Sequence, residues 1–255
     1  MKIIFFVVVL SFLIAARVFA QDNYEIQVYP SETVEEGVTM VELHSNFTPH
    51  GQSFTDGVRP TEDADHETVE ITHGFNPWLE VGFYVFTNIH SGYGWQWVGD
   101  HIRPRVRVPD DWNWPVGVSL STEVGYQRPE YSTDTWTLEV RPIIDKDFPF
   151  MYVSFNPTFG LSFKGENQSK GFDFEPNLKI ALHITKQIDL GAEYYGTTGP
   201  VFTPDPVQQQ SQALFAAVDL NVSPDWEFNF GTGWGLTQST DGFVVKMILG
   251  RRFGG

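Results

Sequence analysis

The sequence predicts an all-β protein that folds as a single transmembrane antiparallel up-and-down β-barrel of about twelve strands. Three observations predict this fold. The chain begins with an export signal, the remainder alternates between apolar and polar residues with a period of two, and the connections are in turn short and long. An even number of strands would bring both ends of the barrel chain to the same side of the membrane.

Residues 1–20 have the three parts of a secretory signal peptide. Lys2 supplies a positive charge, Ile3–Ala16 is an apolar run, and Val18 and Ala20 form the small-residue pattern that precedes a cleavage site. The apolar run is shorter than the roughly 20 residues that a membrane-spanning helix needs. We therefore expect cleavage after Ala20 and export of the mature chain through the inner membrane.

The composition excludes several kinds of function. The chain has no cysteine, so it can form neither disulfides nor thiolate metal sites, and it cannot carry the lipid anchor of a lipoprotein. Its net charge of −16 makes it a poor nucleic-acid binder. We find no motif for a cofactor or a metal, and the sequence predicts none.

The alternation is clearest at 79–89, where one face is apolar from Leu79 to Ile89 and the other carries Glu80 and Asn88. A strand with one apolar and one polar face fits a barrel wall between lipid and a polar interior. The same pattern predicts strands at 38–47, 66–75, 79–89, 100–108, 116–127, 134–144, 151–163, 172–184, 188–197, 213–222, 226–236 and 243–253, within a barrel spanning 37–255.

The connections alternate in length, as they do in bacterial outer-membrane barrels. Short connections are expected on the periplasmic side and longer loops outside. The short ones are 76–78, 109–115, 145–150, 185–187 and 223–225, and the longer ones include 48–65, 90–99, 164–171 and 198–212. Soluble β-sandwiches usually have strands of about five or six residues, and the strands here are longer. Aromatic residues also gather near the strand ends, as at membrane interfaces.

These features predict a location in the bacterial outer membrane. The expected partners are outer-membrane lipid, lipopolysaccharide and an unidentified small solute. The last strand, 243–253, resembles the C-terminal strand by which the barrel-assembly machinery recognises its substrates, although two glycines follow the terminal aromatic residue.

Three features fit this pattern less well. Four prolines lie inside predicted strands, where each removes a hydrogen-bond donor, so we expect bulges or a shifted register at Pro104, Pro142, Pro157 and Pro176. Glu67 and His73 fall on the lipid face, which suggests that the second strand is out of phase or starts above the membrane. Residues 21–36 fit a periplasmic extension, an inward plug or a further strand.

The predicted inner face carries the best evidence for function. A row of basic residues on the fourth strand faces carboxylates on other strands, and we expect the interior to be lined by His101, Arg103, Arg105, Arg107, Glu123, Glu139, Arg141, Asp173, Glu175 and Glu193. Opposed charges of this kind create the transverse field of a diffusion channel. They can also pair within a closed lumen. Inward glycines, such as Gly82, Gly125 and Gly233, would leave room and favour a passage, so we predict a channel or passive transporter.

The alternative functions are an enzyme that acts on lipid or lipopolysaccharide and a closed structural barrel. A lipid hydrolase needs a nucleophile with a base, or a set of residues that activates water, and we find neither G-x-S-x-G nor H-E-x-x-H. The isolated histidines and serines of the strands do not form a motif. The sequence therefore predicts that the protein is not an enzyme and names no catalytic residue.

The stretch 66–83, with its N-P-W turn between two strands, and the segment 226–231 (WEFNFG) resemble proteins of the meta-pathway of phenol degradation family of outer-membrane transporters. The likeness covers most of the mature chain and lies in its overall plan. It implies passive transport of small, hydrophobic solutes. The family has no catalytic motif to carry over, and no site residue is transferred.

Overall fold

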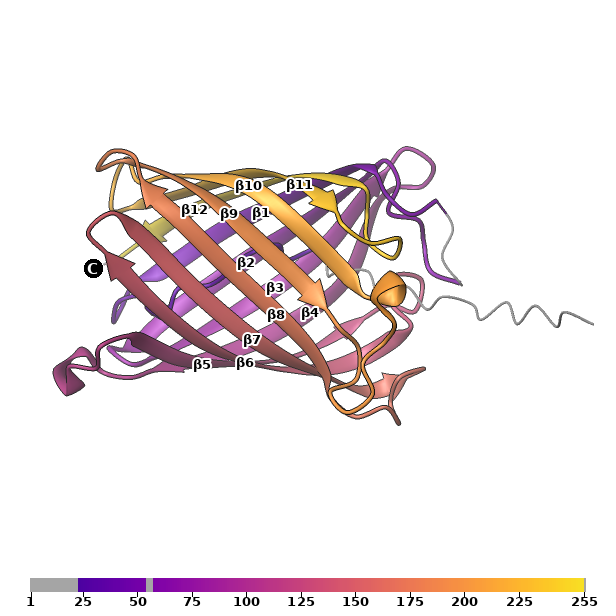
Figure 1. The fold of residues 1–255 in the computed structure, drawn as a ribbon, viewed down its shortest axis with the longest axis horizontal. Helices are drawn as coiled ribbons and strands as arrows, with labels where there is room; N and C mark the ends of the chain where they lie inside the picture. The colour runs from indigo at the N-terminus through magenta and orange to yellow at the C-terminus, as the bar shows by residue number, and fades with distance from the viewer. Residues whose placement is uncertain (1–22, 54–56, 255) are drawn as a thin grey trace, which may run out of the picture.

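The computed structural model describes residues 23–53 and 57–254 (Figure 1). The expected signal peptide, 1–20, lies outside the described residues. Among the described residues, no helix is long and apolar enough to cross a lipid bilayer.

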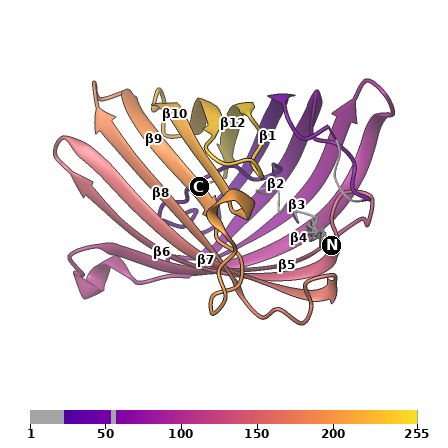
Figure 2. The ribbon, with the colours of Figure 1, turned by 45° about the vertical axis from the view of Figure 1, so that its right-hand side comes forward.

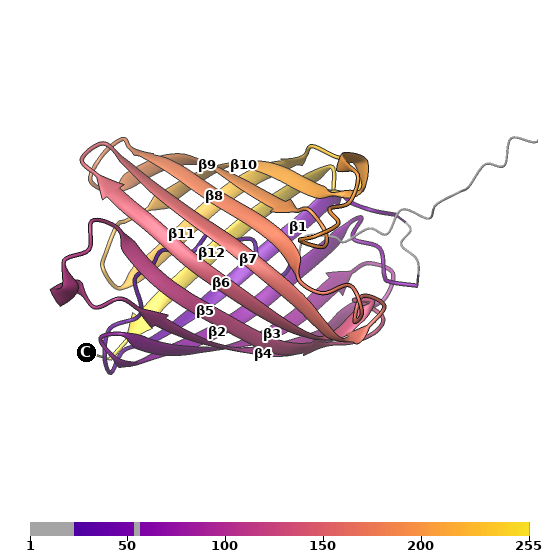
Figure 3. The same ribbon diagram turned by 60° about the horizontal axis from the view of Figure 1, so that its bottom comes forward.

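Twelve antiparallel strands form one closed barrel, in which each strand pairs with its neighbours in the chain and β1 pairs with β12 (Figures 1 and 3). The strands are β1 (Thr39–His50), β2 (Ala64–Asn76), β3 (Leu79–His90), β4 (Gly94–Arg107), β5 (Gly117–Gln127), β6 (Asp134–Phe148), β7 (Met151–Gly165), β8 (Asp173–His183), β9 (Ile188–Thr197), β10 (Ser211–Leu220), β11 (Trp226–Gly235) and β12 (Phe243–Phe253). The predicted fold class and strand number are confirmed.

The two ends of the barrel differ. The end that holds the C-terminus also holds the connections after even strands, including the 3₁₀ helix η1 (Asp110–Trp112), and we call it the turn end (Figure 1). The opposite end, the loop end, holds the connections after odd strands, including η2 (Val207–Gln209). The alternation of short and long connections therefore corresponds to the two ends of one barrel.

One predicted loop is wrong. The segment 90–99 is mostly strand, because β4 begins at Gly94 and only a tight turn separates it from β3. The register between the two strands shifts after Phe86, so that Gly99 and Trp97 face consecutive residues of β3 and Val98 is the extra residue of a bulge. A bulge reverses the phase of the alternation. For that reason the pattern of β4 could be followed only from about residue 100.

The two faces of the strands alternate as predicted. Outward side chains such as Leu43, Phe83 and Leu190 are apolar and exposed, whereas inward positions are buried and mostly polar. The phase of β2 is also as read from the sequence. Glu67 and His73 lie on its outward face near opposite ends of the strand, where Glu67 accepts a hydrogen bond from Ser45 (2.7 Å) and His73 contacts Thr39 (2.9 Å).

The expected bulges at the four strand prolines are not observed. Each proline keeps the register and pairs with only one of its two neighbouring strands. Pro104 is paired with β3 and Pro142 with β5, while Pro157 and Pro176 are paired with each other. The ladders β4–β5 and β6–β7 lack pairs at the prolines and resume in the same register, and the ladder β8–β9 starts beyond Pro176. The missing donor thus interrupts one ladder without displacing the strand.

Residues 23–38, which we call the inner segment, run through the barrel from the loop end to the turn end (Figure 2). At the loop end the Asn23 side chain donates a hydrogen bond to Asp241 (2.6 Å). At the turn end the Gly37 amide donates to the Gly74 carbonyl (2.9 Å). Ile26 and Val28 pack on apolar side chains of β9, β10 and β12 inside the barrel. The structure therefore places this part of the chain inside the barrel.

Candidate functional site in the barrel interior

β4 positions the predicted basic row. Alternate residues of a strand share a face, and His101, Arg103 and Arg105 all point inward, with exposed fractions of 6%, 1% and 5%. Arg107 is the last residue of the strand and contacts Asp110 of η1 at the turn end. Three of the four predicted residues therefore line the interior, and the fourth lies at the rim.

The partners of the two buried arginines come from the two preceding strands. Arg103 contacts Glu70 of β2 (Nη2–Oε1 2.5 Å) and Glu80 of β3 (Nη1–Oε1 3.5 Å). Arg105 contacts the same Glu80 oxygen (2.7 Å). Gly82 lies between Arg103 and β2, and a Cβ there would be 3.3 Å from the guanidinium and from Glu70. The absence of a side chain at Gly82 lets the arginine reach across β3.

The inner segment places Tyr29 at the centre of this cluster. Its aromatic ring is contacted by the guanidinium groups of Arg103 (4.8 Å), Arg105 (5.7 Å) and Arg141 (4.7 Å). Its backbone is held by β7, because the Tyr29 amide donates to the Asn156 side chain (2.7 Å) and its carbonyl accepts from Ser154 (2.7 Å). Cations above an aromatic face are attracted by its negative charge density, so the ring lies among three cations.

The other predicted residues of this region also form close pairs. Arg141 contacts Glu139 of its own strand (2.6 Å) and Glu25 of the inner segment (3.1 Å). Tyr29 donates its hydroxyl proton to Glu25. His101 contacts Glu123 on the adjacent strand β5.

A second ionic cluster lies on the opposite wall, around the predicted residue Glu193 of β9. This carboxylate contacts Lys246 of β12 and Lys179 of β8 (3.3 Å), and it accepts a hydrogen bond from the Tyr195 hydroxyl (2.8 Å). Lys246 also donates to the Ile26 carbonyl of the inner segment (3.1 Å). The remaining predicted residues, Asp173 and Glu175, lie on β8 at the loop end and are half-buried. They are separate from the arginine cluster of β4.

Several residues that complete these clusters were not among those predicted from the sequence. Glu25, Tyr29, Glu70 and Glu80 supply most of the contacts to the arginines, and Glu42 and His44 of β1 lie beside them. The inward phase of the first three strands could have identified Glu42, His44, Glu70 and Glu80. The inner segment carries no signal of that kind, because its contacts depend on its path through the barrel.

The inward glycines were expected to leave an open passage, but the space beside Gly125 and Gly233 is filled. A Cβ at Gly125 would overlap the ring of His101, and a Cβ at Gly233 would overlap the ring of Phe215. Neighbouring side chains have filled the space, as close packing requires. The interpretation of these glycines as free room is therefore wrong.

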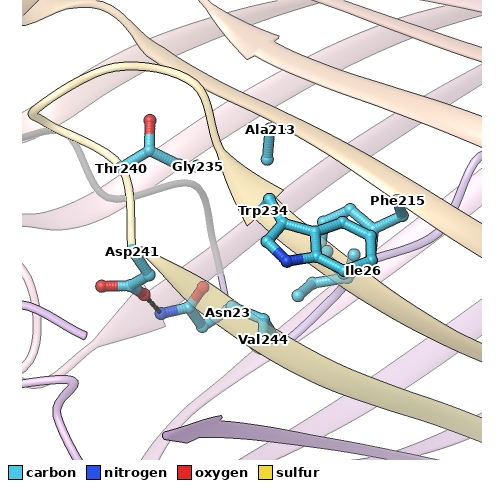
Figure 4. A pocket seen from close by; sticks show the side chains of 10 residues that line it. Asn23, Ile26, Ala213, Phe215, Trp234, Gly235, Thr240, Asp241 and Val244 are labelled. Atoms are coloured by element: carbon cyan, nitrogen blue, oxygen red, sulfur yellow. Dashed lines mark hydrogen bonds between the residues drawn. The ribbon is translucent and has the colours of Figure 1, made fainter. Parts of the chain in front are cut away.

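A small cavity remains at the loop end, beside the start of the inner segment (Figure 4). It is lined by apolar groups of Ile26, Phe215 and Val244 and by the hydrogen-bonded pair Asn23 and Asp241. Its volume of about 10 Å³ is close to the space that one water molecule needs. Large solutes therefore have no room there in this conformation.

Closed barrels of an even number of antiparallel strands with an apolar outside are a fold of bacterial outer-membrane proteins. No protein-family model matches the chain, and no curated protein matches it in sequence. Among solved structures, it is similar to an outer membrane channel from Pseudomonas putida F1, with a TM-score of 0.60 and 11% identity over 90% of this chain and 100% of that one.

The chain is also similar to two solved porin structures over most of its length. The NanC porin has a TM-score of 0.53 and 8% identity, covering 84% of this chain and 99% of that one. The KdgM porin has a TM-score of 0.52 and 9% identity, covering 85% and 99%. These comparisons agree with the expectation of a porin-like barrel, whereas no family model supports the narrower resemblance to the phenol-degradation family.

Proposed function

We propose that this protein is an outer-membrane channel or passive transporter for small solutes, and that the inner segment closes it in the conformation described above. The similarity to outer-membrane channels and porins supports the general class. The single observation that carries the proposal is the path of residues 23–38. They occupy the position of a pore, and they are joined to the barrel wall at one end by the chain and elsewhere by non-covalent contacts.

Apart from the apolar packing of Ile26 and Val28, many of these contacts are polar and can be exchanged for hydrogen bonds to water. The Ser31 amide and hydroxyl donate to Asp145 (2.9 and 2.6 Å), and the Val34 amide donates to Glu80 (2.6 Å). If the segment leaves, water replaces these hydrogen bonds, and the net cost for a bond to a carboxylate is about 1.5–3 kcal/mol. The inner wall left behind would present Arg103, Arg105 and Arg141, whose planar guanidinium groups bind carboxylates and phosphates.

The charge of the wall is tested by ion selectivity. Mature protein reconstituted in planar bilayers should show discrete conductance steps, and the double variant R103A/R105A should be less selective for anions than the wild type. Arg251→Ala is the control for loss of an arginine charge, because its side chain points outward and packs on Trp226 and Phe253. Equal selectivity of all three proteins would argue against a role of the β4 arginines in the passage.

The role of the inner segment is tested by loosening its centre. Tyr29→Ala removes the ring that lies among the three guanidinium groups, and it should increase the fraction of time spent in the conducting state. A membrane that stays silent with both the wild type and this variant, at every voltage, would contradict the channel.

A closed structural barrel is the second candidate, favoured by the complete burial of Arg103, Glu193 and Lys246. A closed barrel would give no conductance with the wild type or with Tyr29→Ala, although both proteins are correctly folded. Circular dichroism and the shifted mobility of unboiled barrels on denaturing gels would establish the folding.

We also propose that the protein resides in the bacterial outer membrane, among lipid and lipopolysaccharide, and that assembly uses the last strand. β12 closes the barrel against β1, and its final residue Phe253 pairs with Thr39. Cell fractionation should find the wild type in the outer membrane. A Phe253→Ala variant should assemble more slowly, and equal assembly rates would argue against recognition through this residue.

A further inference from the structure

Three potential metal ligands meet on the inner face of β1 and β2. Glu42 and His44 are two residues apart on β1, so they share a face, and Glu42 is directly paired with Glu70 of β2. One ligand atom from each residue lies within 4.8 Å of the other two. His44 and Glu70 are completely buried, and Glu42 is 6% exposed.

The charges at this position are not balanced. Glu70 and Glu80 are matched by Arg103 and Arg105. Within the described chain, the carboxylate of Glu42 has neither a salt bridge nor a hydrogen bond. Like charges that face each other across two strands destabilise the pair, and a buried carboxylate without a partner is costly. A cation between Glu42 and Glu70 would remove both costs.

The imidazole of His44 also lacks a hydrogen bond. Neither of its ring nitrogens has a hydrogen-bond partner, and Nε2 lies 3.5 Å from Oε2 of Glu70, an oxygen that itself accepts none. A buried polar group is normally hydrogen-bonded or bound to a metal. This nitrogen and this oxygen are adjacent and neither forms a hydrogen bond, which is the arrangement expected of two ligands of one ion.

The surroundings of Glu70 fix this orientation. Its other oxygen, Oε1, accepts hydrogen bonds from Arg103 (2.5 Å) and from the Thr72 hydroxyl (2.7 Å), so Oε2 is directed toward His44. Metal-binding carboxylates are typically held by such contacts from outside the ligand set. On the other side of β1, Glu42 is paired with Gly250 of β12, and a Cβ there would lie 3.0 Å from Glu42 Cγ, so the absence of a side chain at Gly250 leaves room for Glu42.

We propose that Glu42, His44 and Glu70 form a binding site for one divalent transition-metal ion. Two ligand atoms about 2.1 Å from a tetrahedral Zn²⁺ are roughly 3.4 Å apart, which agrees with the 3.5 Å between His44 and Glu70. One imidazole nitrogen with two carboxylate oxygens suits Zn²⁺ or Mn²⁺, whereas Ca²⁺ and Mg²⁺ prefer oxygen ligands alone. The ion would join β1 to β2 next to the inner segment, and this role does not depend on solute passage.

Because the site is buried, metal should enter most readily while the barrel folds. The mature protein is therefore refolded from urea into detergent with ZnCl₂ or MnCl₂, freed of excess ion by gel filtration, and measured for metal by mass spectrometry. We expect one ion per chain, and for Mn²⁺ a broadened electron paramagnetic resonance signal. Refolding with CaCl₂ or MgCl₂ should leave no bound ion.

The variants Glu42→Gln and His44→Gln should retain no ion, and Thr72→Val should bind roughly tenfold more weakly. His66→Gln is the matched control, because His66 is another buried inward histidine of β2 that contacts the Asn46 carbonyl (3.2 Å) and lies outside the ligand set. It should bind like the wild type.

A second measurement guards against variants that do not fold. Zn²⁺ should raise the unfolding temperature of the wild type and of the His66→Gln variant, and leave Glu42→Gln unchanged. The metal-free Glu42→Gln protein should be at least as stable as the metal-free wild type, because it lacks the unmatched carboxylate. No retained ion in a folded wild type, or equal retention after His44→Gln, would overturn the site.

Discussion

Lys246 offers the most direct test of how the interior is held together. Its side chain is completely buried. The ammonium group contacts the Glu193 carboxylate and lies within hydrogen-bond distance of the Tyr195 hydroxyl (3.2 Å) and the Ile26 carbonyl (3.1 Å). Lys246→Met keeps most of the side-chain volume and removes the charge.

The expected loss follows from what remains around Glu193. Removing one partner of a buried ion pair typically costs about 3–5 kcal/mol. Here Lys179 stays 3.3 Å from Glu193, but it also contacts Asp219 (2.8 Å), so one cation would serve two carboxylates. We therefore expect a loss near the lower limit, about 3 kcal/mol.

The double variant K246M/E193Q separates the ion pair from packing. It leaves no unmatched charge, because Lys179 keeps Asp219 as its partner. Its loss of stability should therefore be smaller than that of Lys246→Met alone. Two neighbouring residues that act independently would instead give additive losses.

The assay is reversible urea unfolding in detergent micelles, followed by tryptophan fluorescence. Lys186→Met, in the exposed turn between β8 and β9, is the control for removing a lysine charge, and it should change stability by less than about 0.5 kcal/mol. A loss below about 1 kcal/mol for Lys246→Met, or additive losses in the double variant, would refute the reasoning.

Three further predictions use the same unfolding assay. Tyr29→Ala should cost about 3–5 kcal/mol through lost packing. Tyr29→Phe removes only the hydrogen bond to the Glu25 carboxylate and should cost less, about 1.5–3 kcal/mol. Equal losses would contradict the packing role of the ring. Gly125→Ala forces the buried His101 ring to move and should cost about 1–3 kcal/mol. Gly160→Ala should cost less, because its new Cβ meets only the flexible end of a glutamate at 3.1 Å. Burial raises the pKa of Asp241, in the loop between β11 and β12. The protonated carboxyl then favours the folded state, so stability relative to Asp241→Asn should be greatest below the unfolded pKa of roughly 3.9 and fall as pH rises through the folded pKa; parallel pH profiles would contradict this.

The wall of the barrel could be predicted from the sequence because it depends on local patterns. β9 and β12 begin and end at the predicted residues, since a period of two ends there in turns rich in glycine, proline and polar residues. The start of β4 could not be predicted, because the bulge at Val98 interrupts the alternation. The bulges expected at the prolines were wrong for a different reason, because pairing with one neighbouring strand is enough to keep a strand in register.

The contents of the barrel could be predicted only in part. The inward direction of Arg103 follows from the strand pattern, but its contact with Glu70 joins residues 33 positions apart and depends on the register of three strands. Tyr29 contacts β3, β4, β6 and β7 together. No periodicity in the sequence relates the inner segment to those strands, so its position required the three-dimensional structure.

The chemistry of the interior bears on whether the inner segment can move. An apolar filling would lose its contacts on opening and gain nothing from water. Here the segment has apolar contacts through Ile26 and Val28, but it also meets charged groups. Arg105 donates to the Pro30 carbonyl (3.0 Å), and Lys246 donates to the Ile26 carbonyl. Buried charges are costly to desolvate, and replacing them by apolar groups is often neutral or stabilising. Hydration of these cations on opening would therefore offset part of what the lost contacts contributed. Under the proposed function, the polar part of this filling is what would keep the closed and open states close enough in free energy for the segment to move.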